Sequence, residues 1–182
     1  MTQNKKTIIL STDNVNKLKE LEALISTDEF EVKTKADFKL TDFAVEETGQ
    51  TLEENAALKV EGLVQKLEDE GVDLSKAYVL SDDTGLFVDI LNGKPGVYSS
   101  RYAGLHASDA DNVDKLLDAI SAFPQEERTA HFSTVICYYH QGQLNYVEGR
   151  LDGILMNERR GSEGFVYDPI FYLPDREKTL AQ

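Results

Sequence analysis

The sequence is short of several features, and each shortage excludes a class of protein. Its 182 residues include a single cysteine, Cys137, so the chain has no internal disulfide, which fits a reducing cytoplasm. No apolar run is long enough to cross a membrane, and the polar residues 1–6 are not followed by the apolar segment of a signal peptide. We therefore expect a cytoplasmic protein without a membrane partner.

Positive charge is also scarce. Nineteen lysines and arginines stand against 33 aspartates and glutamates, which gives a formal net charge of −14. Nucleic-acid binding depends on clustered cations that contact phosphates, so this composition argues against a nucleic-acid partner. A small anionic substrate remains compatible with the charge if local lysines and a metal ion offset the field of the whole protein.

Several common signatures are missing as well. The chain has no internal repeat and no low-complexity tract, its three histidines lack the spacing of a zinc site, and no Walker loop is present. The length, with 41% hydrophobic and 29% charged residues, suits one soluble domain over residues 1–182 with a proper core.

The most informative stretch covers residues 79–89. An apolar, strand-like lead-in is followed by two adjacent carboxylates, Asp82 and Asp83, and then by Thr84 and Gly85. Carboxylates at the end of a buried strand are costly to desolvate unless a cation faces them, and Mg²⁺ takes oxygen ligands of this kind. The alternative is that residues 82–85 form only a turn, in which Gly85 lets the backbone bend sharply.

Hydrophobic periodicity predicts the elements around this stretch. Expected strands cover residues 7–10 and 29–32, and residues 131–139 and 144–151 form a hairpin. Expected helices cover residues 15–25, residues 51 to about 70, and a third segment capped by Ser108 or Asp109. The first strand runs into the first helix, an arrangement that binds anions, although an ordinary capped helix with a solvated lysine explains it equally well.

Several motifs agree in order and spacing with one family. They are Thr12-x-Asn14-x-x-Lys17, Glu46-Glu47-Thr48-Gly49, Glu54-Asn55-Ala56-x-x-Lys59, Ser81-Asp82-Asp83-Thr84-Gly85-Leu86, the segment from Leu91 to Gly104, Gly164-Phe165-x-Tyr167-Asp168-Pro169-Ile170-Phe171, and Lys178-Thr179. Through them the chain resembles, over essentially its whole length, the inosine triphosphate pyrophosphatases. These enzymes hydrolyse non-standard purine nucleoside triphosphates to a monophosphate and pyrophosphate.

The resemblance implies a fold, an assembly and a cofactor. The fold would be an elongated α/β structure with two lobes around a mixed β-sheet, flanking helices and an active-site cleft between the lobes. The assembly would be a homodimer. Mg²⁺ would be held by Glu46 and Asp83, with Asp83 as the general base and Asp82 beside it. Pyrophosphate release needs such neutralisation of charge on the bridging oxygens.

The resemblance also implies a set of substrate contacts. Thr84 takes the place of the family's usual serine and keeps its hydroxyl, and Phe165 would stack on the purine. The residues expected to bind substrate are Thr12, Asn14, Lys17 and Lys59 at the phosphates, Thr84 near the acids, Phe165, Tyr167 and Asp168 at the base, and Lys178 near the phosphates.

Three departures from the family pattern bear on the site. Asp13 and Val166 stand where the family has glycine, beside a phosphate loop and the base pocket respectively. Family members also continue with a helical tail whose Ser-His-Arg motif contacts the base, whereas the sequence ends at Gln182. We therefore expect these residues alone to discriminate poorly between inosine and adenosine triphosphates.

The expected function is Mg²⁺-dependent hydrolysis of ITP, dITP and XTP. One alternative is a nucleotide-binding protein of the same fold with weak or lost catalysis, as the departures suggest. A second is a phosphatase that forms an aspartyl-phosphate, but such enzymes place an Asp-x-Asp pair after the first strand, and this chain has none there.

Overall fold

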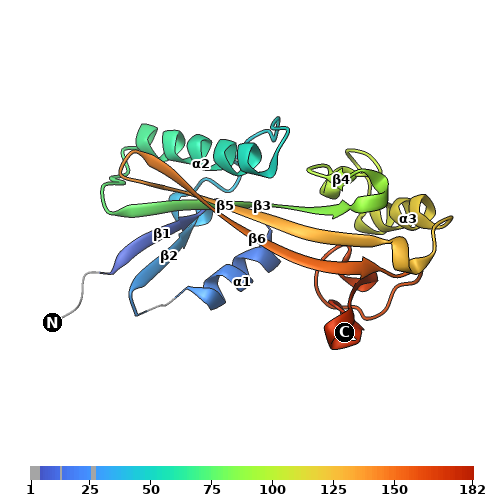
Figure 1. The fold of residues 1–182 in the computed structure, drawn as a ribbon. Helices are drawn as coiled ribbons and strands as arrows, with labels where there is room; N and C mark the ends of the chain where they lie inside the picture. The colour runs from blue at the N-terminus through green and yellow to red at the C-terminus, as the bar shows by residue number, and fades with distance from the viewer. Residues whose placement is uncertain (1–4, 13, 26–27) are drawn as a thin grey trace. The chain divides into compact units, whose positions relative to one another are not determined.

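The computed structural model describes residues 5–12, 14–25 and 28–182, and these residues form a mixed α/β fold (Figure 1). Its eight strands make one sheet with the order β2-β1-β3-β5-β6-β7-β8, and β4 pairs with β3. The strands are β1 (Lys6–Leu10), β2 (Phe30–Thr34), β3 (Ala77–Val88), β4 (Pro95–Gly96), β5 (Thr129–His140), β6 (Gln143–Leu155), β7 (Phe171–Leu173) and β8 (Lys178–Thr179). The helices are α1 (Val15–Leu24), α2 (Leu52–Asp69) and α3 (Asp109–Ile120). The predicted α/β class with a mixed sheet is confirmed.

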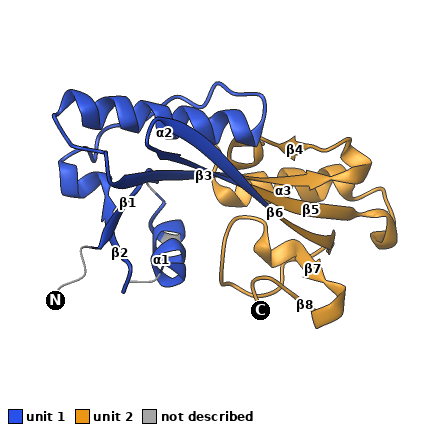
Figure 2. Cartoon of the chain, turned by 60° about the vertical axis from the view of Figure 1, so that its left-hand side comes forward, with its two compact units in different colours: residues 1–83, 135–148 blue, residues 84–134, 149–182 orange. Residues whose placement is uncertain are grey.

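The chain divides into two compact units, each built from two chain segments (Figure 2). Unit 1 contains residues 1–83 and 135–148, and unit 2 contains residues 84–134 and 149–182. The chain passes from unit 1 to unit 2 between Asp83 and Thr84, inside β3. The single domain and the cleft expected from the family resemblance stay predictions.

Unit 1 is built on parallel strands. β1 pairs in parallel with both β2 and β3, with Ile8 opposite Val32 on one side and Tyr78 on the other. Figures 1 and 2 both show α2 along one face of these strands and α1 on the opposite side. Its apolar stripe packs α2 onto the sheet, as the helical spacing predicted. The largest fully buried side chains of unit 1 include Ile9, Leu10, Val60, Leu63, Leu67 and Val79.

The helix starts follow the predicted capping chemistry. The Thr51 hydroxyl accepts the Glu54 N–H at 3.1 Å, and the Glu54 carboxylate accepts the Thr51 N–H at 3.2 Å, which makes a capping box at the start of α2. Ser108, one of the two expected caps, begins α3 in the same way with Asp111. None of the helices that the structure describes is long and apolar enough to span a bilayer.

Unit 2 has its own core around α3 and the outer strands. The side chains of Val113, Leu116 and Ile120 form the buried face of α3. They pack with apolar residues of β3, β6 and the C-terminal segment. The other buried members of this core are Leu86, Val88, Ala130, Leu155, Tyr167, Ile170 and Phe171.

The predicted hairpin is present and longer than expected. β5 and β6 extend beyond the predicted ranges of residues 131–139 and 144–151. Gln141 and Gly142 connect them with φ values of 50° and 81°, the left-handed pair that a two-residue hairpin turn requires. Asn92 and Gly93 form a second such turn, with φ values of 53° and 80°, as the Asn-Gly pair favours.

The turn interpretation of residues 82–85 is wrong. β3 continues without a break from Ala77 to Val88, so Asp82 and Asp83 lie inside a strand. Gly85 does not bend the chain either. A Cβ atom there would lie 2.6 Å from the carbonyl oxygen of Gly96, so glycine allows β4 to approach β3 closely.

Candidate functional site

The two carboxylates of Asp82 and Asp83 lie just past the point where β1 ends beside β3. The N–H of Ser11, directly after β1, donates to the Leu80 carbonyl at 2.7 Å. Asp82 and Asp83 follow in β3 and are only 8% and 9% exposed. Open α/β sheets bind ligands beyond the carboxyl ends of their parallel strands. This edge of unit 1 is therefore the candidate site.

Two side chains of α2 hold the Asp83 carboxylate. Lys59 Nζ lies 3.2 Å from its Oδ1, and Asn55 Nδ2 donates to its Oδ2 at 3.3 Å. Burial raises the pKa of Asp83 above its usual value; Lys59 opposes this shift, and the nearby Glu47 carboxylate adds to it. A carboxylate with a raised pKa accepts a proton more readily, which suits a general base.

Asp82 is paired with a lysine from the start of α1. Lys17 Nζ lies 2.5 Å from Asp82 Oδ2. The Thr12 hydroxyl accepts the Asn14 N–H at 3.2 Å, and Asn14 Oδ1 accepts the Lys17 N–H at 3.2 Å. These short-range bonds fix the first turn of α1, so the three residues predicted to hold phosphate gather at one helix start.

Lys59 connects the parts of the cluster. Its Nζ donates to the Asp82 carbonyl at 2.6 Å and lies 3.1 Å from Glu47 Oε1, in addition to its contact with Asp83. Burial alone lowers the pKa of Lys59, but the carboxylates of Asp83 and Glu47 outweigh burial and raise it. Lys59 therefore stays protonated at neutral pH, as a phosphate-binding lysine must.

The motif over residues 46–49 contributes a different carboxylate from the one expected. Glu46, the predicted metal ligand, is exposed, whereas the half-buried Glu47 is the residue that pairs with Lys59. Across residues 5–12, 14–25 and 28–182, no three carboxylate, histidine or cysteine side chains are grouped so that they could hold a metal ion. The assignment of Mg²⁺ to Glu46 and Asp83 stays a prediction.

Asn55 is the site residue that the sequence analysis missed. Its side chain is fully buried, and its Oδ1 accepts the Gly49 N–H at 2.8 Å while its Nδ2 reaches Asp83. A Cβ atom on Gly49 would lie 2.6 Å from Asn55 Oδ1, so only glycine fits there. The available signal was the position of Asn55 four residues before Lys59, on the same helix face.

The residues expected to read the base lie in unit 2, within one tight turn. Asp168 Oδ2 accepts the Phe165 N–H at 2.6 Å, and Gly164 has a φ of +84° with its Cβ position filled by the Asp168 carboxylate. Tyr167 is buried, which raises its pKa, and its hydroxyl donates to the Ser99 carbonyl at 2.7 Å. Of the three predicted base-binding residues, Phe165 is the one that stays half-buried rather than buried.

The remaining predicted residues take separate places. Thr84, the first residue of unit 2, has its hydroxyl 2.9 Å from that of Thr134. Lys178 is exposed at the start of β8. Val166, expected beside the base pocket, packs against the core of unit 2. Asp13 lies outside the described residues.

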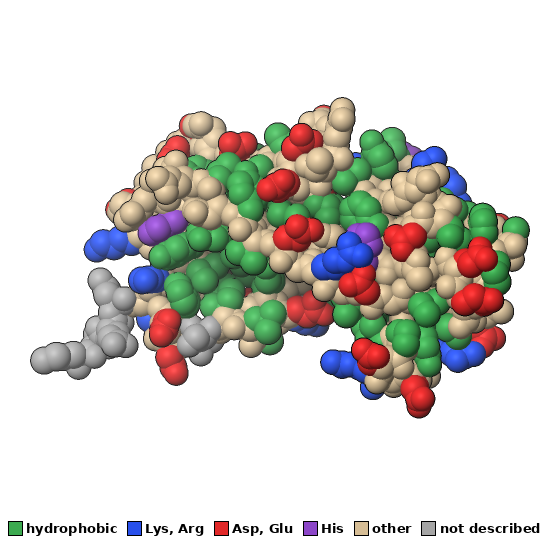
Figure 3. Space-filling view, in the orientation of Figure 1, with side chains coloured by type: hydrophobic (Ala, Val, Ile, Leu, Met, Phe, Trp, Pro, Cys, Tyr) green, Lys and Arg blue, Asp and Glu red, His purple; other side chains and the backbone are tan. Residues whose placement is uncertain are grey.

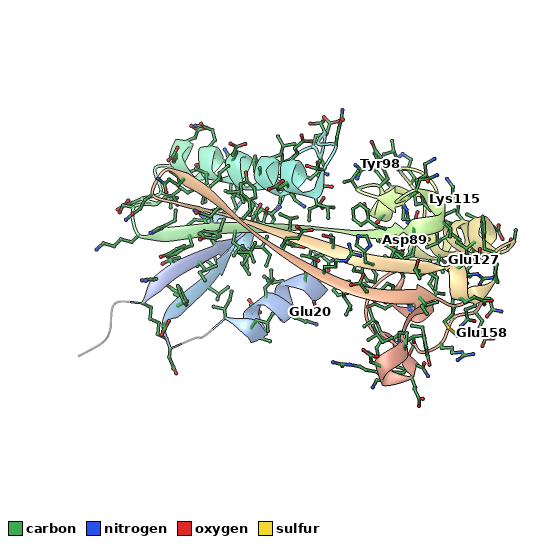
Figure 4. The ribbon with its side chains drawn as sticks, in the orientation of Figure 1. Glu20, Asp89, Tyr98, Lys115, Glu127 and Glu158 are labelled. Atoms are coloured by element: carbon green, nitrogen blue, oxygen red, sulfur yellow. The ribbon has the colours of Figure 1, made fainter. Side chains whose placement is uncertain are left out.

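Asp89, the last acid of the central stretch, bonds to a threonine of unit 2 and not to the lysines of the candidate site. It is labelled in Figure 4 beyond the end of β3, and its carboxylate accepts the Thr129 hydroxyl at 2.6 Å. Both residues belong to unit 2. Three carboxylates raise the pKa of Lys59: Asp83 and Asp82 from the central stretch, and Glu47 from the loop before α2. Asp89 is not one of them.

Ammonium groups and carboxylates that meet at the carboxyl edge of parallel strands, next to a helix start, are typical of α/β proteins that bind phosphate groups. The chain belongs to the Ham1 family, whose model matches residues 8–182. The motifs described above are thus confirmed as the marks of a true relationship.

Several dITP/XTP pyrophosphatases match nearly the whole chain. The dITP/XTP pyrophosphatase of Thermoanaerobacter pseudethanolicus is 41% identical over 175 residues, which cover 96% of this chain and 84% of the relative. The dITP/XTP pyrophosphatase of Geobacillus kaustophilus is 42% identical over 178 residues, with 97% and 83% covered.

Solved structures agree with the fold. The Staphylococcus aureus Ham1 protein matches with a TM-score of 0.82 at 36% identity, over 97% of this chain and 86% of that one. A protein of Mycobacterium abscessus described as a nucleoside-triphosphatase and dITP/XTP pyrophosphatase matches with a TM-score of 0.75 at 33% identity. The match covers 96% of this chain and 87% of that one. The identity in both cases is high enough to support the family assignment as well as the fold.

Proposed function

We propose that this chain hydrolyses the non-standard purine nucleoside triphosphates ITP, dITP and XTP to a nucleoside monophosphate and pyrophosphate. The observation that carries the proposal is the position of Lys59, whose Nζ meets the buried Asp83 carboxylate at 3.2 Å and the Asp82 carbonyl at 2.6 Å. This contact lies in a member of the Ham1 family, and relatives about 40% identical to it are named dITP/XTP pyrophosphatase.

Phosphate binding falls to the two lysines and the start of α1. Lys17 pairs with Asp82, and Lys59 pairs with Asp83. A triphosphate brings additional negative oxygens to these ammonium groups, and the Thr12 and Asn14 side chains keep the first turn of α1 in place to receive them. Lys178 would add a further charge near the phosphates.

Asp83 is the proposed general base. Its carboxylate accepts a proton from the attacking water, the water oxygen bonds to phosphorus, and pyrophosphate leaves with the electron pair of the broken P–O bond. Asn55 and Lys59 hold the carboxylate from two sides during this step. Asp82 keeps Lys17 directed at the same place.

Mg²⁺ is the proposed cofactor, with Asp83 and Glu46 as its protein ligands. The residues present fit a hard cation, because the acidic side chains at the site offer only oxygen donors. When ionised, Asp82, Asp83 and Glu47 also exceed the two lysines that contact them by one charge. Mg²⁺ bound there would neutralise phosphate oxygens and lower the pKa of a bound water.

The purine would be bound in unit 2. Phe165 offers a half-buried ring for stacking, and the hydrogen bond from its N–H to Asp168 holds the turn that carries this ring. Because the Tyr167 hydroxyl is already bonded to Ser99, we assign Tyr167 to shaping the pocket and not to a polar contact with the base.

We further propose that the protein works as a homodimer in the cytoplasm. Support for association comes from exposed apolar side chains on β6, with Tyr146 at 43% and Val147 at 57% exposure. Sedimentation at rising protein concentration tests this proposal, and a monomer at all concentrations would contradict it.

The deciding experiment is turnover of a panel of purine triphosphates with Mg²⁺, with pyrophosphate and orthophosphate measured separately. Pyrophosphate released in equal amount to monophosphate from ITP, dITP and XTP supports the proposal. Orthophosphate released alone supports a phosphatase. Tight binding of ITP without turnover supports a nucleotide-binding protein that has lost catalysis.

A further inference from the structure

Unit 1 contains a cavity at the end of the sheet opposite the carboxylates. Its volume is about 350 Å³. It lies where β1 and β3 begin and β5 ends, and its lining includes Lys5, Lys6, Ser75, Lys76, Tyr78 and His140. Tyr78 and Asp83 are five residues apart along β3, which is about 16 Å at the usual rise of a strand. The cavity is therefore separate from the candidate active site.

The charge of the cavity differs from that of the protein. The chain carries a net charge of −14, yet three lysines line this one cavity, and none of its described lining residues is acidic. Figure 3 shows basic side chains and a histidine gathered at this end of unit 1. Lysines that line one hollow favour an anion there, even in a protein of net negative charge.

One wall of the cavity is aromatic and well ordered. The rings of Tyr78 and His140 stack with centroids 3.9 Å apart and an interplanar angle of 7°, and Phe30 meets Tyr78 edge-on at 6.1 Å. His140 Nδ1 lies 2.9 Å from the Ala77 carbonyl, which can only accept, so Nδ1 carries a proton. Lys6 Nζ lies 5.9 Å from the Tyr78 ring centroid. Tyr78 and His140 thus form one ordered wall of the cavity, and the Lys6 amine lies near it.

A carboxylate near the cavity is already engaged. The Ser75 N–H donates to Asp73 Oδ1 at 2.9 Å, and this bond, together with one from the Ser75 side chain, lowers the pKa of Asp73. Asp73 is therefore held by Ser75, while the residues that line the cavity are basic, aromatic or uncharged.

We propose that this cavity binds a small phosphate-bearing anion, either free pyrophosphate or the phosphate end of a nucleoside monophosphate. Lysine ammonium groups bind phosphate as point charges, and the volume lies within the range of small-ligand pockets. The site is inferred from the cavity, and the choice of these two ligands rests on the proposed function, whose reaction releases both. The distance from Asp83 allows the anion and a substrate to bind at the same time.

The test is an amide NMR titration of the full chain in the presence of a chelator, with pyrophosphate in one series and inosine monophosphate in another. Saturable shifts at residues 75–78 and at His140 are expected, and they are resolved from shifts near Lys17 and Lys59. The series with the tighter binding identifies the source of the phosphate. Sulfate at equal ionic strength is the reference anion. If sulfate bound at the cavity as tightly as the two ligands, the shifts would reflect non-specific screening of the lysines, and the proposal would be overturned.

Matched variants complete the test. Lys6→Gln with Lys76→Gln should weaken binding at the cavity about tenfold or more, because two of its charges are lost. Lys19→Gln with Lys39→Gln removes the same charge from unit 1 outside the cavity and should change binding less than about twofold. Equal affinities in the two double variants, or no shifts at residues 75–78, would overturn the proposal. Dispersed amide spectra verify that both variants are folded.

Discussion

Asn55 and Asp83, 28 residues apart in the sequence, are joined by a buried hydrogen bond of 3.3 Å. The same amide accepts the Gly49 N–H at 2.8 Å, so one side chain connects the loop before α2 to the carboxylate on β3. Its removal would leave polar groups on both sides without their partner. The position of Asp83 therefore depends on a residue that is not itself expected to touch substrate.

Asp83→Asn should reduce kcat by more than about 10²-fold, because the amide cannot act as a base. The substitution barely changes the side-chain volume, and the thermal unfolding temperature should not fall. Steady-state turnover of ITP with Mg²⁺ measures the first effect and circular dichroism the second. A folded variant that keeps more than about a tenth of wild-type turnover would show that Asp83 is not the base.

Asn55→Ala should lower the free energy of unfolding by about 1–3 kcal/mol and also reduce kcat, since Asp83 and Gly49 lose a shared partner. Asn112→Ala is the matched control. Asn112 is also fully buried, and it bridges the Ala103 N–H at 2.7 Å and the Ser100 carbonyl at 3.2 Å. The control should lose similar stability with kcat little changed, measured well below the unfolding temperature. If both variants lost kcat equally, Asn55 would act only on stability and not on the position of Asp83.

Removal of the metal ion should abolish turnover. Without Mg²⁺ the carboxylates of Asp82 and Asp83 would repel a polyanionic substrate. Turnover of ITP is measured in excess chelator and again after Mg²⁺ is restored, and activity should rise toward alkaline pH as a bound water loses its proton more readily. Full activity in chelator would contradict the Mg²⁺ proposal.

Cys137 should resist alkylation in the native protein. Burial raises the pKa of its thiol from 9.0 to about 11, although a hydrogen bond with Tyr146 acts in the opposite direction. At pH 8.5 the native thiolate is then roughly 10²-fold scarcer than in an unfolded chain. Iodoacetamide labelling in buffer and in urea, followed by mass measurement, checks this ratio. Comparable rates in the two solvents would mean that the thiol is accessible.

The raised pKa of the Cys137 thiol also determines how the stability of the protein changes with pH. The unfolded thiol loses its proton near its usual pKa and the native thiol only near 11, so the native state binds more protons between these values. The contribution of Cys137 to the free energy of unfolding is thus fully present below pH 9 and falls as pH rises from 9 to 11. Cys137→Ala should show a smaller fall over that range in urea titrations. If the free energy of unfolding fell equally in the variant and the wild type, groups other than Cys137 would cause the fall.

The sequence predicted the elements that follow from periodicity and capping, such as α2 from Thr51 onward and the β5–β6 hairpin. It did not predict how β3 continues through Asp82 and Asp83, because local turn propensity and the tertiary pairing of a strand disagree there. The contact of Lys59 with Glu47 and not Glu46 depends on how the loop over residues 46–49 is tied down. That tie comes from Asn55, whose helical spacing to Lys59 places it on the right face but does not reveal its bonds to Gly49 and Asp83.

The division of each unit into two chain segments has a consequence for synthesis on the ribosome. Val135 and Cys137, both buried, come from the segment that completes unit 1 only after most of unit 2 has been translated. Unit 2 in turn waits for residues 149–182. Contacts this distant in sequence slow folding, and the nascent chain leaves apolar strands uncovered in the meantime. Neither unit is therefore complete until late in translation, when its second segment has been made.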